Sequence, residues 1–207
     1  MNMHTKLKPV AGGGRTDSAA RRRFTADELL HMEETGVLRE DEHLELLDGE
    51  IMTMAAKSPR HEDMRTMLSE YFTDHGSKEL RVAQEPAFRL SDHCEPEPDI
   101  LLFSRSLRVH EVRGPAALLV IEVAYSSLST DLTIKAHIYA AHGVREYWVV
   151  DAKRIVTYVH REPGPEGYGS VVEIAADQIV TPLLVPQVAL KLGDLGLEPL
   201  PDDEGTK

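Results

Sequence analysis

The hydrophobic and polar positions of the chain follow two periods. Apolar residues spaced three or four apart favour helices, and short apolar runs that end at turn residues favour strands. The helices are predicted at about 26–35, 60–75 and 129–142, a hairpin within 44–52, and strands at 81–90, 98–103, 117–123, 146–150, 154–160 and 168–174. The third helix joins two strands, which predicts a crossover to a parallel neighbour. After Pro182 the pattern predicts irregular chain with one helical turn at 192–195.

Local signals mark where these elements begin and end. Thr25-x-x-Glu28 is a capping box that starts the first helix, and Gly36 and Gly143 are suited to end the first and third helices. Asp48-Gly49 lies between two apolar runs. A type I′ turn needs positive φ at both of its central positions, so this pair predicts a tight hairpin.

Two of the predicted strands carry an acid inside an apolar run, Asp99 in one and Glu122 in the other. An ionised carboxylate in such a run costs several kcal/mol without a partner. The connection 104–116 has no helical apolar period, so antiparallel pairing is the simplest topology, and it makes the two acids cross-strand neighbours with Cβ atoms about 5 Å apart. Like charges this close repel, and a divalent cation such as Mg²⁺ between them makes the arrangement favourable.

Lys135 lies thirteen residues after Glu122, in the helix that follows the strand carrying that acid. A helix that begins there starts close to the carboxylate, and the long lysine stem can bring its ammonium to the same site. Simpler interpretations exist for each residue. Lys135 has the spacing of a surface ion pair with Asp131, worth about 0.3–0.5 kcal/mol. Asp99 can cap the start of its strand, and Glu122 can pair with an arginine.

Length and composition indicate one soluble globular domain with tails, because 207 residues are 42% hydrophobic and 28% charged. The pattern predicts a disordered basic arm at 1–23, a single domain at 24–196 and an acidic tail at 197–207. No apolar run has the length of a membrane span and the N-terminus has no signal-peptide core, so a cytoplasmic location is expected. The single Cys94 agrees with a reducing compartment and is predicted to be half-buried.

The net charge of the chain limits which binding partners are expected. The formal charge is −12, with a balance of +5 in residues 1–23 and −17 in the rest. Phosphate binding draws on Lys and Arg, so this balance argues against tight binding of duplex nucleic acid. It does not exclude a magnesium-dependent nuclease, whose site is acidic and whose metal reverses the local charge.

The sequence around the two acids and Lys135 resembles the Uma family, whose members are described as putative restriction endonucleases. This family belongs to the PD-(D/E)XK nuclease superfamily. The resemblance runs from about 24 to 195. It is carried by an ordered set of motifs: Glu45-Leu-Leu-Asp-Gly-Glu50, Ser58-Pro-Arg-His61, Pro98-Asp99-Ile100, Glu122-Val123 with Ser126-Ser127-Leu128, Asp131-x3-Lys135-x3-Tyr139, and Gly143-Val-Arg-Glu-Tyr-Trp-Val-Val-Asp151.

The resemblance implies a restriction-endonuclease-like α/β fold, with a mixed central sheet flanked by helices. It implies that Asp99 and Glu122 are catalytic acids that bind the metal, together with the carbonyl of Val123, and that Lys135 is the catalytic lysine. Glu45 and His61 match further polar positions near the site.

The chain departs from the superfamily pattern at Ala124, which stands where the usual Glu-x-Lys motif has its lysine. Tyr125 stands where relatives with the same Ser-Ser-Leu variant often have Asp.

The implied activity is metal-assisted hydrolysis of phosphodiester bonds in nucleic acid, with DNA as the expected substrate, Mg²⁺ as the cofactor, Mn²⁺ as its substitute, and a homodimer as the assembly. A second hypothesis is a nuclease-fold protein that binds nucleic acid or regulates without catalysis. A third is a metal-dependent hydrolase or nickase that acts on a nucleic acid other than duplex DNA. Metal binding and cleavage assays distinguish the three.

Overall fold

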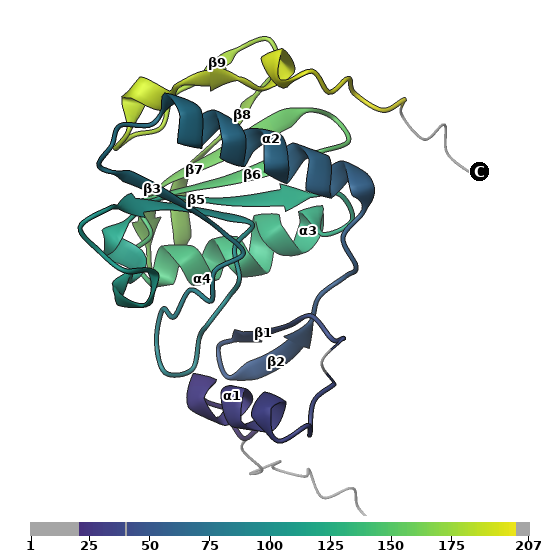
Figure 1. Cartoon of the computed structure of the whole chain (residues 1–207), viewed down its shortest axis with the longest axis vertical. Coiled ribbons are helices and arrows are strands. Elements are labelled where there is room, and N and C mark those ends of the chain that lie inside the picture. Colours follow the sequence, from purple (N-terminus) through teal and green to yellow (C-terminus); the bar gives the residue numbers. More distant parts are fainter. Residues whose placement is uncertain (1–20, 40, 202–207) are drawn as a thin grey trace, which may run out of the picture.

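A six-stranded mixed sheet forms the centre of the computed structural model, which describes residues 21–39 and 41–201. The strand order is β3-β4-β5-β6-β7-β8, and all neighbours are antiparallel except β5 and β6, which are parallel as predicted (Figure 1). The mixed α/β class predicted from the sequence is therefore confirmed. The strands are β3 (Leu80–Gln84), β4 (Ile100–Ser104), β5 (Ala117–Ala124), β6 (Glu146–Asp151), β7 (Val156–Gly164) and β8 (Gly167–Ile174).

Helices cover both faces of the sheet (Figure 1). One face is covered by α2 (Pro59–His75), whose first turn is capped by the Ser58 hydroxyl. The other is covered by a helical segment of three parts, α3 (Leu128–Thr130), a π-helical turn η3 (Asp131–Lys135) and α4 (Ala136–Ala141). Two short 3-10 turns, η1 (Val109–Glu111) and η2 (Gly114–Ala116), occupy the connection between β4 and β5.

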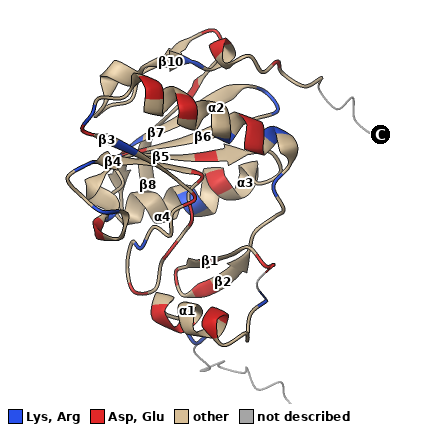
Figure 2. Ribbon diagram, viewed as in Figure 1, with Lys and Arg blue, Asp and Glu red and all other residues tan. Residues whose placement is uncertain are grey.

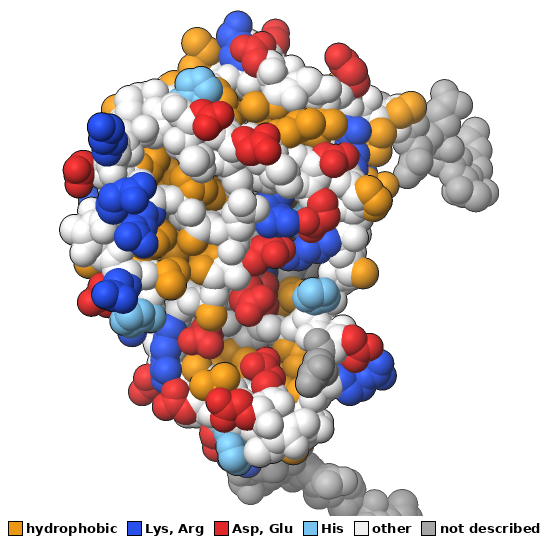
Figure 3. Space-filling view, in the orientation of Figure 1, with side chains coloured by type: hydrophobic (Ala, Val, Ile, Leu, Met, Phe, Trp, Pro, Cys, Tyr) orange, Lys and Arg blue, Asp and Glu red, His pale blue; other side chains and the backbone are white. Residues whose placement is uncertain are grey.

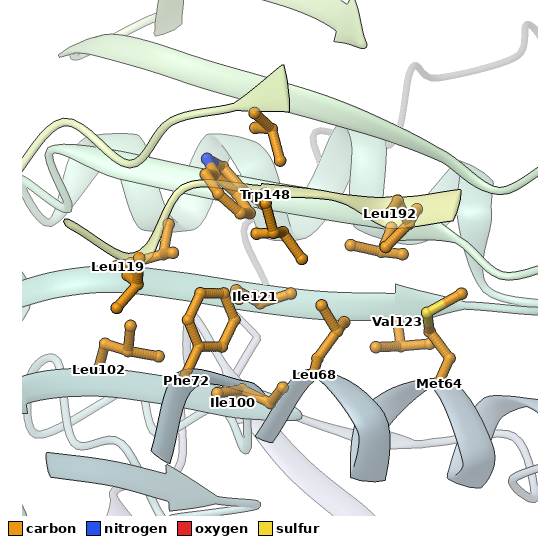
Figure 4. Packing of buried hydrophobic residues seen from close by; sticks show 14 of the residues in the cluster. Met64, Leu68, Phe72, Ile100, Leu102, Leu119, Ile121, Val123, Trp148 and Leu192 are labelled. Carbon is orange, nitrogen blue, oxygen red and sulfur yellow. The ribbon is translucent and has the colours of Figure 1, made fainter. Parts of the chain in front are cut away.

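Successive side chains of the central strands point alternately toward α2 and toward the α3–α4 segment. In β5, Ile121 and Val123 pack against α2, while Val120 and Ala124 face α4. Glu122 shares the parity of Val120 and Ala124, so it points toward α4. Figure 4 shows the α2 side of the core, where aliphatic side chains of β4 and β5 meet Phe72 and Trp148.

A small unit lies beside this body, formed by α1 (Ala26–Glu34) and the hairpin of β1 (Leu44–Leu47) and β2 (Glu50–Thr53) (Figure 1). Asp48 and Gly49 have φ of 51° and 83°, as the predicted type I′ turn requires. Leu46 packs under α1 with Ala26 and Leu29. A backbone bridge between Leu46 and Glu95 joins the hairpin to the body.

The C-terminal segment packs beside α2 and contains β9 (Ile179–Val180), the turn η4 (Pro186–Val188), β10 (Leu190–Lys191) and η5 (Leu192–Leu195). Its apolar residues Val185, Val188 and Leu192 complete the core on the α2 side. The helical turn predicted at 192–195 is confirmed as η5.

Several predictions need correction. The strand predicted at 81–90 ends at Gln84, because Glu85 has φ of 48° and turns the chain out of the ladder. The helix predicted at 129–142 contains the π-helical turn. Cys94, predicted to be half-buried, is fully buried, with a thiol pKa raised to about 11 by burial.

Most of the predicted basic arm, and residues 202–207 of the acidic tail, lie outside the described residues. Within the described part of the arm, Arg21, Arg22 and Arg23 form exposed ion pairs with Glu50, Glu28 and Asp48. No helix within 21–39 and 41–201 has the length and apolar character needed to cross a membrane.

Candidate active site

Strand register brings the two strand-borne acids together, as the sequence predicts. Ile100 of β4 pairs with Ile121 of β5 in antiparallel register, and one further step along this register places Asp99 opposite Glu122. Both carboxylates are buried, with 5% and 3% of their residues' surface exposed. Figure 2 shows acidic positions on β5 and on the helical segment beside it, with a basic position close by.

Two donors hold one oxygen of the Glu122 carboxylate. The Lys135 ammonium donates to Oε1 at 3.0 Å and the Tyr139 hydroxyl donates to the same oxygen at 2.8 Å. Lys135 and Tyr139 are four residues apart and so lie on one face of the helical segment. Among the described residues no hydrogen bond reaches Glu122 Oε2, so this oxygen is left for another partner.

Asp99 is oriented from a different side. Its Oδ2 accepts the backbone N–H of Val123 at 2.7 Å and hydrogen-bonds His61 Nε2 at 3.1 Å, and the same nitrogen lies 3.0 Å from Oδ1. His61 is presented by the first turn of α2, which begins at the Ser58 cap. The Lys57 ammonium lies 3.8 Å from Asp99 Oδ1.

The β1–β2 hairpin contributes a third acid, Glu45. The Lys135 ammonium donates to Glu45 Oε1 at 2.9 Å, so it bridges Glu45 and Glu122, both of them buried. Glu45 Oε2 is buried and has no hydrogen-bond partner among the described residues. A buried oxygen that keeps its charge without a donor is costly, so this atom favours a cation or a water in the space it faces.

Electrostatics at the site reflect this crowding of acids. Burial raises the pKa of Glu122 well above its ordinary value, and Lys135 acts against that rise. Burial also raises the pKa of Asp131 to about 6. Burial opposes ionisation of Asp99 as well, but the hydrogen bond and charge of His61 and the Val123 N–H hold its pKa below the ordinary value. Burial alone would lower the pKa of Lys135, and Glu122 and Glu45 raise it instead.

These groups line a pocket of about 270 Å³, which we call the acidic pocket. Its walls come from the connection between β2 and α2, the ends of β4 and β5, and the first turns of the α3–α4 segment. In Figure 3 acidic and basic side chains are gathered where the α2 side of the body meets the hairpin unit. Its lining includes Glu45, Lys57, His61, Asp99, Glu122, Val123, Tyr125, Asp131 and Lys135.

The donor set fits a hard divalent cation. Its available ligands are carboxylate oxygens, and Mg²⁺ is bound in proteins through one or two carboxylates while its other positions are filled by water and phosphate. Within 21–39 and 41–201 no three His, Cys, Asp or Glu side chains are grouped to hold a metal by themselves. A cation here would therefore rest on Asp99 and Glu122. Glu122 Oε2 accepts no hydrogen bond from the described residues, whereas both Asp99 oxygens lie within 3.1 Å of His61 Nε2.

The structure brings every predicted site residue into this one region: Asp99, Glu122, Val123, Lys135, Glu45 and His61 all line the acidic pocket. The alternative of a surface ion pair is wrong, because Asp131 and Lys135 are 2% and 4% exposed and Lys135 pairs with Glu45 and Glu122 instead.

Sequence reasoning assigned no role to Lys57 or Tyr139. The sequence did contain a signal for Tyr139, because Asp131, Lys135 and Tyr139 are spaced four residues apart and therefore lie on the same face of a helix. Lys57 stands in a connecting segment without a periodic pattern, so no signal in the sequence pointed to it.

The fold and the pocket together define an α/β protein with a buried carboxylate and lysine cluster at the end of a central strand. The chain belongs to the Uma2 family, described as "Putative restriction endonuclease", whose model matches residues 26–193. This match agrees with the family that the motifs indicated.

One solved structure supports the fold assignment. A structure described as a putative nuclease belonging to DUF820, from Anabaena variabilis, has a TM-score of 0.66 and 18% sequence identity, over 83% of this chain and 97% of that chain. At this identity the likeness shows a shared fold, which confirms the predicted nuclease-like architecture. The type IIG restriction endonuclease BpuSI has a TM-score of 0.34 and 13% identity, over 49% of this chain and 11% of that chain, and this weak likeness carries no argument. No curated protein matches the chain.

Proposed function

We propose that this chain is a divalent-metal-dependent endonuclease that hydrolyses phosphodiester bonds of DNA, with Mg²⁺ as the cofactor and Mn²⁺ as a substitute. The observation that carries the proposal is the convergence of Asp99, Glu122 and Lys135 in one pocket, where Glu122 Oε2 and Glu45 Oε2 have no donor among the described residues. Membership of the Uma2 family supports a nuclease activity.

Asp99 and Glu122 would hold the cation, with the carbonyl of Val123 as a further ligand. When bound, a divalent cation offsets the charge of the scissile phosphate and lowers the pKa of water. His61 fixes the orientation of the Asp99 carboxylate, and Tyr139 fixes that of Glu122.

Lys135 has a separate role in the proposed reaction. An ammonium has three N–H donors, and two of those of Lys135 go to Glu45 and Glu122. The third is free to orient a water or to bind a phosphate oxygen, where its charge offsets the charge that develops in the transition state. Glu45 would act by positioning this ammonium.

Cleavage of supercoiled plasmid tests the proposed function. The protein should convert the plasmid to nicked or linear forms with Mg²⁺ or Mn²⁺ and leave it intact with EDTA. Removing the charge of a metal ligand in Glu122→Gln, or the ammonium in Lys135→Met, should lower the rate at least about 100-fold. Glu70→Gln, at an exposed acid of α2 outside the pocket, is the matched control and should cleave like wild type.

Two outcomes would contradict the proposal. One is plasmid that stays supercoiled under all metal conditions. The other is cleavage by Glu122→Gln at the wild-type rate, which would indicate a contaminating nuclease. Binding of metal and DNA without cleavage would favour the non-catalytic alternative.

We also propose that the chain acts as a homodimer, because cleavage of both strands needs two sites and most soluble oligomers have two-fold symmetry. Light scattering at micromolar concentration should give twice the mass of the 23.1 kDa chain. A monomer at that concentration would contradict this part of the proposal.

A further inference from the structure

An aromatic residue that lines the acidic pocket, Tyr125, lies against the ammonium group of Lys153. Tyr125 follows β5 directly, is half-buried and lines the pocket three residues after Glu122. The Lys153 ammonium lies over the Tyr125 ring, 4.6 Å from its centroid. No other Phe, Tyr or Trp among the described residues lines this pocket.

Both side chains are held by the backbone of the central sheet. Because β5 and β6 are parallel, with Ala124 beside Asp151, the segments that leave them emerge at the same edge. Asp151 Oδ1 accepts the backbone N–H groups of Lys153 and Arg154 at 2.9 and 3.1 Å and so fixes the turn that carries Lys153. The ring and the ammonium therefore form a positioned pair.

A nucleotide has groups that match both members of this pair. Its base can stack on an aromatic ring, which is worth about 1–3 kcal/mol per base and depends little on sequence. Its phosphate can bind a lysine as a point charge. A cation over a tyrosine ring contributes only about 0.5–1 kcal/mol at exposed sites, so a phosphate can draw the Lys153 ammonium away at small cost.

The shape and charge of the site favour an unpaired strand over a regular duplex. The two carboxylates are at most 5% exposed, inside a pocket of about 270 Å³, so a phosphate must enter the pocket to reach them. In a duplex the bases are stacked on one another and paired, so a base is free to stack on the Tyr125 ring only where the strand is unpaired. A single strand also has a lower charge density than a duplex, so an acidic protein repels it less.

We propose that the substrate reaches the acidic pocket as an unpaired strand, with a base stacked on Tyr125 and the adjoining phosphate bound by Lys153. This proposal rests on the proposed nuclease function and narrows its substrate to single-stranded or locally melted DNA. Tyr125 and Lys153 then determine specificity, and the acids and Lys135 perform the chemistry.

Fluorescence anisotropy with Ca²⁺ in place of Mg²⁺ tests the proposal without relying on cleavage. The probes are a labelled 20-nucleotide single strand, its duplex, and the duplex with a central unpaired bubble. Wild type should bind the single strand and the bubble at least 10-fold more tightly than the duplex. Tyr125→Ala should weaken single-strand binding about 5- to 100-fold and change duplex binding little, and Tyr125→Phe should restore the loss because it keeps the ring.

Lys153→Met should weaken single-strand binding and lower its salt dependence by about 0.7 in the slope of log affinity against log salt. Lys191→Met, at an exposed lysine of β10 outside the pocket, is the matched control and should bind like wild type. Thermal unfolding midpoints of the Tyr125 variants, compared with wild type, separate loss of binding from loss of fold.

The proposal is overturned if wild type binds the duplex most tightly, if it binds none of the probes, or if Tyr125→Ala weakens binding to all three probes equally. Its failure is distinguishable from failure of the nuclease function. If the protein cleaves plasmid and Tyr125→Ala binds the single strand as tightly as wild type, only the unpaired-strand proposal fails. If binding prefers the single strand and depends on the ring but no cleavage occurs, only the proposed nuclease activity fails.

Discussion

Lys135 has an unusual position for a lysine, because the residue is 4% exposed and its ammonium lies between two buried carboxylates, those of Glu45 and Glu122. Burial of charge is costly, and the attraction of each carboxylate to the ammonium offsets this cost only while Lys135 is present. The thirteen-residue spacing and the start of a helix allowed Lys135 to reach Glu122, but spacing alone favoured a surface pair with Asp131, and the family resemblance pointed to the site. The length of the lysine stem made this contact possible, and the spacing did not by itself distinguish it from a surface pair.

Removal of the Lys135 ammonium should destabilise the fold strongly. In EDTA, Lys135→Met leaves two buried carboxylates without a cation and should lower the free energy of unfolding by about 3–5 kcal/mol. Adding Glu122→Gln to this variant should recover part of the loss, since one uncompensated charge is removed. Urea denaturation measures both values. A loss below 1 kcal/mol in the single variant would mean that the buried ion pair does not form.

Asp131 gives a prediction with a defined pH range. Burial raises its folded-state pKa to about 6 from 3.8, so the folded protein binds this proton more tightly than the unfolded chain does. The stability contribution of Asp131 therefore falls as pH rises from about 4 through 6. Asp131→Asn keeps an acceptor for the Ser127 hydroxyl and has no charge.

In EDTA, Asp131→Asn should be more stable than wild type by about 1–3 kcal/mol at pH 7.5, and the difference should disappear below about pH 4. Urea denaturation across this range measures the effect. A difference that is constant with pH would show that Asp131 titrates alike in the folded and unfolded states.

At the scale of elements, most helices and strands followed from local patterns, and the exceptions depend on tertiary contacts. The Asp48-Gly49 hairpin was predictable because the turn chemistry is local. The π-helical turn at Asp131–Lys135 was not, because it lies where buried polar side chains meet the pocket, a contact that no helical period encodes. The end of β3 at Gln84 was missed because alternation continues beyond it.

Asp99 and Glu122 were recognised as candidate site residues because each is an acid within an apolar strand. Glu146 of β6 is also an acid in an apolar strand, but it is not part of the acidic pocket. Glu146 is 1% exposed and shares the parity of Trp148, so it faces the α2 side of the sheet. Its Oε1 accepts from Arg161 Nε at 2.9 Å and Trp148 Nε1 at 3.0 Å, and its Oε2 accepts the Leu183 N–H. The strand pattern shows that such an acid needs a partner, but the partner's identity depends on the fold.

Glu146 should therefore anchor the C-terminal segment. Glu146→Gln weakens its charge-assisted hydrogen bonds and should cost about 2 kcal/mol of unfolding free energy, with faster amide exchange at Leu183. Glu173→Gln, at an exposed ion pair on β8, is the control and should change stability by less than about 0.5 kcal/mol. Unchanged exchange at Leu183 would contradict the anchoring role.

At the scale of the whole molecule, residues far apart in the chain build one site. Glu45 from the hairpin unit, His61 from α2, Asp99 and Glu122 from neighbouring strands, and Lys135 from the opposite layer converge on the acidic pocket. The strand-borne pair was predictable from topology. The positions of Glu45 and His61 were not, because no local pattern fixes how the hairpin unit and α2 pack on the sheet, and only the family resemblance pointed to them.

Metal binding is the central claim that follows from this convergence, and calorimetric titration of Mn²⁺ into metal-free protein tests it most directly. We predict saturable binding to wild type and to Glu70→Gln, and at least tenfold weaker binding to Asp99→Asn and to Glu122→Gln, each of which keeps the side-chain shape but loses a charged ligand. Equal affinity in wild type and both variants, or no binding to wild type, would contradict the account.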